Sequence, residues 1–267
     1  MMKNWKANLY IILINVFFFL PIVAVVFGSF NQNRGNTSWQ GATLEWYVNL
    51  VRDAALLESL RNTILLAVIS MILAVFLGTL AAFGMYSYSF RGKQVIDTMF
   101  YIPVVIPEVV LGISLMVIFS VFQIPSGLLT LTIAHTTFCI PYVVFNVKAA
   151  IAGFDPSIAE ASMDLGATEA QTFRKITIPI IMPGIFSGAY MAFTLSIDDI
   201  IVSSFTNGPG FITLPIMVNG MTKRGIDPDV YALFTIIMIV VFSVIVLTQI
   251  RWNDIFQRIF RRREAAR

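Results

Sequence analysis

Six long apolar stretches alternate with short polar segments along the chain. A helix that crosses a lipid bilayer needs about 20 consecutive, mostly apolar residues, and each of these stretches is about that long. They cover Leu9–Phe30, Thr63–Tyr86, Thr98–Phe122, Leu128–Val147, Ile178–Thr206 and Val230–Ile250. The pattern predicts an all-α integral membrane protein whose six transmembrane helices form a single domain over residues 1–267.

The composition agrees with a chain that keeps much of its surface in lipid. Of the 267 residues, 57% are hydrophobic and only 12% are charged, and the mean hydropathy is +0.81. A soluble domain of this size carries about twice that charged fraction. Because the chain has one cysteine, Cys139, and one histidine, His135, we expect no disulfide framework, no metal site built from these residues and no cofactor.

The first apolar stretch has two basic residues, Lys3 and Lys6, in front of it, as a secretory signal does. The apolar region of a signal peptide is about 7–15 residues long and ends at a cleavage site of small residues. Leu9–Phe30 is longer and no such site closes it. We therefore interpret it as an uncleaved first span.

Lysine and arginine residues outside the spans indicate the orientation, since the cytoplasmic side of a membrane protein is enriched in them. Thirteen of the 18 fall on the side that holds the N-terminus: Lys3, Lys6, Arg91, Lys93, Lys148, Arg174, Lys175, Arg251, Arg258, Arg261, Arg262, Arg263 and Arg267. The other side holds Arg34, Arg52, Arg61, Lys223 and Arg224. We expect both termini to be cytoplasmic.

The segment between the fourth and fifth spans predicts a helical elbow in the cytoplasm. Asp155 is a typical helix cap, and Pro156 fits the first helical position, where its missing N–H costs nothing. A short helix over Ser157–Leu165 would end at Gly166 in the left-handed conformation. A second short helix over Glu169–Lys175 would lead into the fifth span.

The same segment resembles the EAA loop of type I (MetI-like) ABC importer permeases. It reads Glu160-Ala161-Ser162, then Gly166 after three residues, then Ile176-Thr177-Ile178-Pro179 after nine more. Ser162 and Ile178 depart from the family's Ala and Leu. The resemblance implies a type I ABC importer permease fold, in which residues 157–168 form a coupling helix that docks on a separate ATPase subunit. It assigns ATPase coupling to Glu160, Ala161 and Gly166. The chain has no phosphate-binding loop, so we expect it not to be an enzyme.

Three carboxylates lie inside predicted spans, where charged side chains usually mark a pathway. Glu108 follows Pro103 and Pro107 in the third span, and Asp198 and Asp199 lie in the fifth. Consecutive helical residues point about 100° apart, so we expect only one of the two aspartates to face a given cavity. No Lys or Arg falls within a span to neutralise them. A pathway lined by unpaired acids suits a cationic solute, while a proton relay, helix capping and packing remain alternatives.

A second resemblance concerns the solute. The runs Ser196-Ile-Asp198-Asp199, Gly208-Pro209-Gly210, Thr213-Leu214-Pro215 and Tyr101 to Glu108 with Gly112 are similar to the C-type permease subunit of spermidine/putrescine importers. That likeness implies a substrate pathway through Glu108, Asp198, Asp199 and Ser196, in the bacterial inner membrane. Trp46 is a further candidate for the pathway, because a polyamine has charged groups and methylenes that an aromatic face at the outer entrance could receive. The likeness also implies a second homologous permease subunit, two ATP-binding cassette subunits, an extracytoplasmic polyamine-binding protein, polyamine substrate and membrane lipid as partners. The net charge is +3, but the basic residues are dispersed along the chain, so we expect no nucleic-acid partner.

Several alternatives stay open. The chain could be an ABC permease for another small solute or a proton-coupled secondary transporter, although it shows none of the internal duplication that such transporters usually have. No constellation of His, Cys and Ser supports an intramembrane enzyme. Trp46 could present an aromatic face to the solute or anchor the chain at the membrane interface. For His135 we expect a hydrogen-bonded place in the core.

Overall fold

The computed structural model describes residues 5–35, 38–222 and 225–264. Lys3, Lys223, Arg224 and Arg267, which were counted for the orientation, lie outside these ranges. Over the described residues the chain is helical, with two isolated β-bridges in place of strands. It divides into two compact units: unit 1 is Met1–Leu57 with Met221–Arg267, and unit 2 is Glu58–Gly220.

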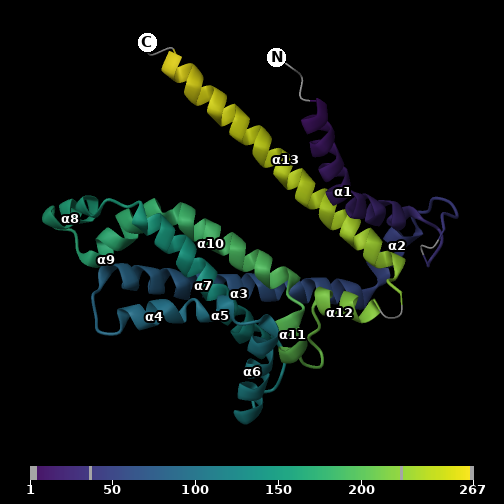
Figure 1. The fold of residues 1–267 in the computed structure, drawn as a ribbon, viewed down its shortest axis with the longest axis horizontal. Coiled ribbons are helices and arrows are strands. Elements are labelled where there is room, and N and C mark those ends of the chain that lie inside the picture. Colours follow the sequence, from purple (N-terminus) through teal and green to yellow (C-terminus); the bar gives the residue numbers. More distant parts are fainter. Residues whose placement is uncertain (1–4, 36–37, 223–224, 265–267) are drawn as a thin grey trace. The chain divides into compact units, whose positions relative to one another are not determined.

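Unit 1 joins the two ends of the sequence. Its helices are α1 (Trp5–Phe30), α2 (Glu45–Arg52) and α13 (Pro228–Glu264), and α13 packs against both of the others (Figure 1). The indole Nε1 of Trp46 donates to the carbonyl of Asn31 at 2.8 Å, and Trp46 is buried. This bond ties α2 to the end of α1.

Unit 2 contains most of the helices. Two long ones, α7 (Leu128–Ala152) and α10 (Ile178–Asp198), pack along each other and carry much of its core. Gly184 and Gly188 face α7, and small residues at a helix contact let two backbones approach closely. The other elements are α3 (Ala54–Ser87), α4 (Lys93–Met99), α5 (Ile102–Val105), α6 (Glu108–Val121), α8 (Pro156–Asp164), α9 (Glu169–Thr172), a π-helix (Phe173–Thr177), α11 (Ile201–Thr206) and α12 (Leu214–Met221).

The face of α3 that unit 2 does not cover is apolar. Ile64, Ile72, Phe76 and Leu80 on this face are each at least 45% exposed. A continuous row of such side chains is typical of a helix that contacts lipid.

Among the described residues, five helices are long and apolar enough to cross a membrane, and a bent pair makes a sixth candidate. The bent pair corrects our prediction of one continuous third span over Thr98–Phe122. Lys93–Val105 and Glu108–Val121 meet at an angle of 107°. The physical reason is Pro107, which lacks an N–H and disfavours helical backbone in the residue before it. Ile106 is accordingly extended, with φ −69° and ψ 134°.

The predicted fifth span over Ile178–Thr206 is likewise interrupted. α10 ends at Asp198, Asp199 is extended with ψ 125°, and α11 starts at Ile201. The two interruptions, at Pro107 and at Asp199, bring the three membrane carboxylates to helix ends.

Candidate functional site

The two interrupted helices meet at a pocket of about 270 Å³ within unit 2. Glu108, the first residue of α6, and Asp198, the last residue of α10, both line it and are exposed. Asp199 lines the same pocket. Of the described residues around it, none is Lys or Arg. We call this site the acidic pocket.

The expectation that Asp198 and Asp199 would face different cavities is wrong for this pocket. It assumed a continuous helix, in which neighbours diverge by about 100°. Because the backbone leaves the helix at Asp199, that divergence does not apply. The two aspartates nevertheless have different surroundings, since Asp198 is exposed and the side chain of Asp199 is only 6% exposed.

Asp199 is engaged by the protein itself. Its carboxylate accepts hydrogen bonds from the backbone N–H groups of Val202 at 3.2 Å and Ser203 at 2.7 Å, as the first turn of α11 requires of a capping residue. Its Oδ2 also lies 3.5 Å from Nε2 of His135. The capping and packing alternative therefore describes the observed surroundings of Asp199.

His135 occupies the hydrogen-bonded core position that we predicted. It is fully buried on α7, with Nδ1 2.7 Å from the hydroxyl of Ser196 and Nε2 2.9 Å from that of Ser203. Ser196, assigned by resemblance to the substrate pathway, is itself 3% exposed. The structure therefore brings Ser196 and Asp199 together around His135, beside the acidic pocket.

The aromatic groups at the pocket are ones that the sequence analysis missed. Phe138 and Tyr142 of α7 line it, one helical turn apart. Trp46, the residue considered for this role, lies buried in unit 1. The available signal was the four-residue spacing of Phe138 and Tyr142, which places both rings on one face of a helix.

The predicted elbow between the fourth and fifth spans is present. Asp155 caps α8 by accepting the N–H of Ser157 at 3.0 Å, and this hydrogen bond holds the pKa of Asp155 below its usual value. Gly166 has φ +89° and ends the first helical segment, as predicted. Glu160, Ala161 and Gly166 are all exposed, and Leu165 beside the turn is 90% exposed. The elbow thus presents an apolar tip to its surroundings.

The sequence analysis missed what holds the two arms of the elbow together. The Ser162 hydroxyl lies 3.0 Å from that of Thr172, so the residue that departs from the family pattern bonds α8 to α9. Thr168 and Gln171 cap α9 reciprocally, at 3.3 Å and 3.0 Å. A Thr followed three residues later by Gln was the available signal.

The link from the elbow to α10 is the π-helix Phe173–Thr177, where we had expected the second short helix to continue to Lys175. Its first residue, Phe173, packs on Phe83 of α3 with ring centroids 4.2 Å apart. A single π-helical turn inside a helix is rare and frequently marks a functional site. At the same end of unit 2, Lys148 of α7 pairs with Asp97 of α4 at 2.5 Å.

These features define a helical membrane protein with an acidic pocket at broken helices and a projecting helical elbow. The chain belongs to the family of binding-protein-dependent transport system inner membrane components, whose profile matches residues 74–262. It is therefore a membrane-spanning permease of the bacterial inner membrane.

Individual relatives agree with this assignment. The chain is 37% identical to the "Spermidine/putrescine transport system permease protein PotC" of Escherichia coli (strain K12), over 90% of this chain and 91% of that protein. It is 38% identical to the "Putrescine transport system permease protein PotI" of the same organism, over 83% and 82%. The crystal structure of a bacterial ABC transporter involved in the import of the acidic polysaccharide alginate has a chain that matches with a TM-score of 0.70. That match covers 92% of this chain and 96% of that one at 13% identity, and supports the type I permease fold alone.

Proposed function

We propose that this chain is the permease subunit of an ATP-driven importer of polyamines such as spermidine and putrescine. The observation that carries the proposal is the acidic pocket, where Glu108 and Asp198 stand exposed with no Lys or Arg among the described lining residues. A carboxylate without a counterion in the membrane must take up a proton or attract a cation. The names of the two Escherichia coli relatives point to the same class of solute.

The aromatic rings of the pocket fit a polyamine as well. An ammonium group is attracted to the face of an aromatic ring, and the methylene chain between ammonium groups is apolar. Phe138 and Tyr142 offer such rings beside Glu108 and Asp198. In this proposal the acids recognise the charged groups and the two rings accept the methylenes.

We further propose that the elbow couples transport to ATP hydrolysis on a separate subunit. In this proposal Glu160 and Ala161 contact the ATPase, Gly166 forms the turn and the exposed Leu165 enters a groove on that subunit. One chain encloses half of a pathway. A second, homologous permease, two ATPase subunits and an external polyamine-binding protein would complete the importer, with both termini of this chain in the cytoplasm.

Substitution of the two exposed acids tests the proposed cargo. Glu108→Gln and Asp198→Asn keep the shape and remove the charge, so uptake of radiolabelled spermidine and putrescine into cells should fall about ten- to a hundredfold. Glu58→Gln, an exposed carboxylate of α3 outside the pocket, is the matched control and should transport normally. The amount of each variant in the membrane should equal that of the wild type.

Wild-type uptake by both pocket variants would reject a role for the acids in transport. A wild-type chain that carries a different small solute, and no polyamine, would favour the alternative of an ABC permease with another substrate. The family assignment would stand in either case, since it does not depend on the pocket.

A further inference from the structure

The side chain of His135 joins three helices at the edge of the acidic pocket. It projects from α7, its Nδ1 lies 2.7 Å from the Ser196 hydroxyl of α10, and its Nε2 lies 2.9 Å from the Ser203 hydroxyl of α11. All three residues are at most 3% exposed. A buried imidazole with both nitrogens engaged is fixed in orientation, because each of its polar atoms would lose a partner if the ring turned.

His135 bonds residues on both sides of the interruption between α10 and α11. Ser196 lies two residues before Asp198, and Ser203 lies in the first turn of α11. Asp199 completes the arrangement, since it bonds the backbone of Ser203 while its Oδ2 lies 3.5 Å from the imidazole. The two sides of the interruption are thus tied to one ring on α7.

The arrangement around His135 is also connected, through α11, to Glu108, the other exposed acid of the pocket. This helix packs against α6, where Phe205 lies over Gly112 so closely that a Cβ at Gly112 would come within 2.6 Å of its ring. α6 starts at Glu108. A displacement of α11 would therefore be transmitted to Asp198 through the two residues that join α10 to α11, and to Glu108 through Phe205.

We propose that His135 is a positioning residue that sets the geometry of the acidic pocket by locking α11 to α7 and α10. The proposal rests on the proposed transport role of Glu108 and Asp198, and adds that their separation is imposed by an imidazole that does not line the pocket. Without His135, the Ser196 and Ser203 hydroxyls and Asp199 lose a shared partner in the interior. Rearrangement of α11 to find new partners is the expected response.

The test uses the complete importer in proteoliposomes with saturating, polyamine-loaded binding protein. His135→Leu removes both hydrogen bonds at similar bulk, and His135→Gln keeps one donor and one acceptor. Thr137→Val is the matched control on α7, because the Thr137 hydroxyl donates to the carbonyl of Ile133 within the same helix. A reporter cysteine at the exposed pocket residue 200, Ile200→Cys, is labelled with a maleimide, and the native Cys139 is buried.

The two variants of His135 distinguish the loss of its hydrogen bonds from a change of its side-chain volume. His135→Leu should lower the maximal rate of spermidine uptake about tenfold and change the labelling rate at position 200 several-fold, while His135→Gln stays within about twofold of wild type for both. The concentration of loaded binding protein that gives half-maximal uptake should not change. Thr137→Val should match the wild type throughout.

Two results would overturn the proposal: wild-type uptake and labelling in His135→Leu, or equal loss in the Leu and Gln variants with labelling unchanged. If His135→Leu does not reach the membrane, Ser203→Ala replaces it, and should alter labelling in the same direction. If the wild type transports no polyamine, the proposed cargo fails, while the labelling of position 200 still decides whether His135 positions α11.

Discussion

Asp198 and Asp199 are neighbours in the sequence with opposite uses in the structure. Asp199 accepts two backbone N–H groups and lies beside His135, so its charge stabilises the start of α11. Asp198 has an exposed carboxylate that faces the pocket. At the scale of single residues, a membrane carboxylate is available to a solute only when the protein has not already engaged it.

Asp155 offers a prediction at this scale. Hydrogen bonds from Ser157 keep its pKa below the usual value, so its capping contribution is present above the unfolded-state pKa and is lost as the pH falls through the lower folded-state pKa. At neutral pH, Asp155→Ala should speed hydrogen exchange of the Ser157 amide several-fold, whereas Asp155→Asn should preserve its protection. Equal exchange in the wild type and Asp155→Ala, measured by mass spectrometry, would contradict the cap.

The sequence was sufficient to find the carboxylates but not to distinguish them. Their partners are distant along the chain: His135 bonds Ser196 61 residues away and Ser203 68 residues away. No local pattern predicts such a pairing, because it depends on how α7 and α10 pack. The expectation for His135 itself was confirmed, since a buried polar side chain in a largely apolar helix generally requires hydrogen-bond partners.

At the scale of elements, the elbow was predicted nearly to the residue and the spans were not. The cap Asp155, the following Pro156 and the left-handed Gly166 are local signals, and each determines its own backbone conformation. The 107° bend has a local cause in Pro107, whereas the end of α10 at Asp199 has no proline or glycine to announce it. A hydropathy window cannot see either one, because the residues on both sides of the break are apolar.

Gly166 carries a prediction about the elbow as an element. Its φ of +89° strains any residue with a Cβ and excludes β-branched ones, although nothing lies within 4 Å of the position where a Cβ would be. Gly166→Val should therefore reorient α9 relative to α8 and abolish ATP-driven uptake. Gly166→Asn is the control, since asparagine tolerates this conformation, and should retain most of the activity.

The readout for Gly166 combines uptake with assembly. If the elbow docks on the ATPase, the Gly166→Val permease should be present in the membrane at the wild-type level. A pull-down of this variant should recover less ATPase subunit than a pull-down of the wild type. Normal uptake by Gly166→Val would remove the support for the elbow as the coupling element.

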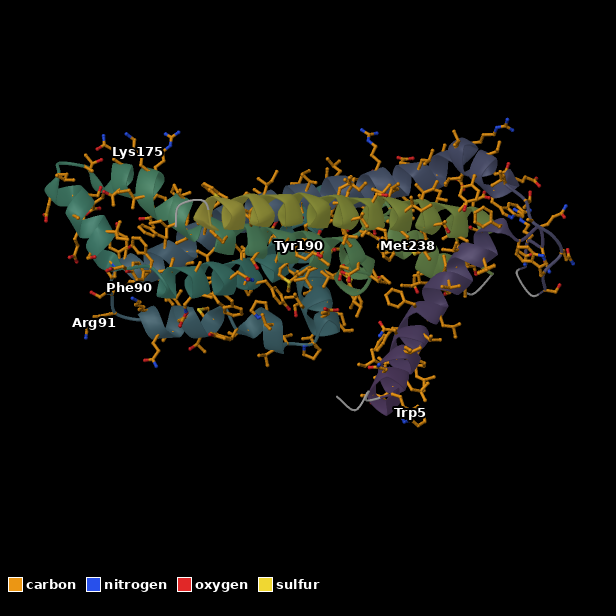
Figure 2. The ribbon with its side chains drawn as sticks, turned by 90° about the horizontal axis from the view of Figure 1, so that it is seen from above. Trp5, Phe90, Arg91, Lys175, Tyr190 and Met238 are labelled. Carbon is orange, nitrogen blue, oxygen red and sulfur yellow. The ribbon has the colours of Figure 1, made fainter. Side chains whose placement is uncertain are left out.

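At the scale of the whole molecule, one end of unit 2 gathers the features assigned to the cytoplasm. Figure 2 shows Phe90, Arg91 and Lys175 together at one end of this unit, and Figure 1 shows α8 and α9 at that end. Arg91 and Lys175 come from two loops that the charge count placed on the same side. The basic residues and the elbow thus lie at the same end of unit 2, which supports the proposed cytoplasmic orientation of that end.

Reporter fusions test this orientation across the entire chain. Fusions at Gly92 and Gly153 should behave as cytoplasmic, together with one at Arg267, which lies outside the described residues. Fusions at Gly35, Ser126 and Gly220 should behave as extracytoplasmic. The reason is that an odd number of crossings separates every member of the first set from every member of the second, provided that the bent pair α4–α6 crosses the membrane as one span. Alkaline phosphatase is active only outside the cytoplasm and green fluorescent protein fluoresces only inside, so paired fusions at each site give opposite signals.

Ser126 is the sensitive position, because it follows α6 directly. A cytoplasmic signal there would mean that the bent pair is a re-entrant loop and that the number of crossings is five. That arrangement would also place Gly153 outside the cytoplasm, because the single span α7 separates it from Ser126. An extracytoplasmic signal at Gly153 would therefore contradict the coupling proposal, since an ATPase subunit could not reach the elbow.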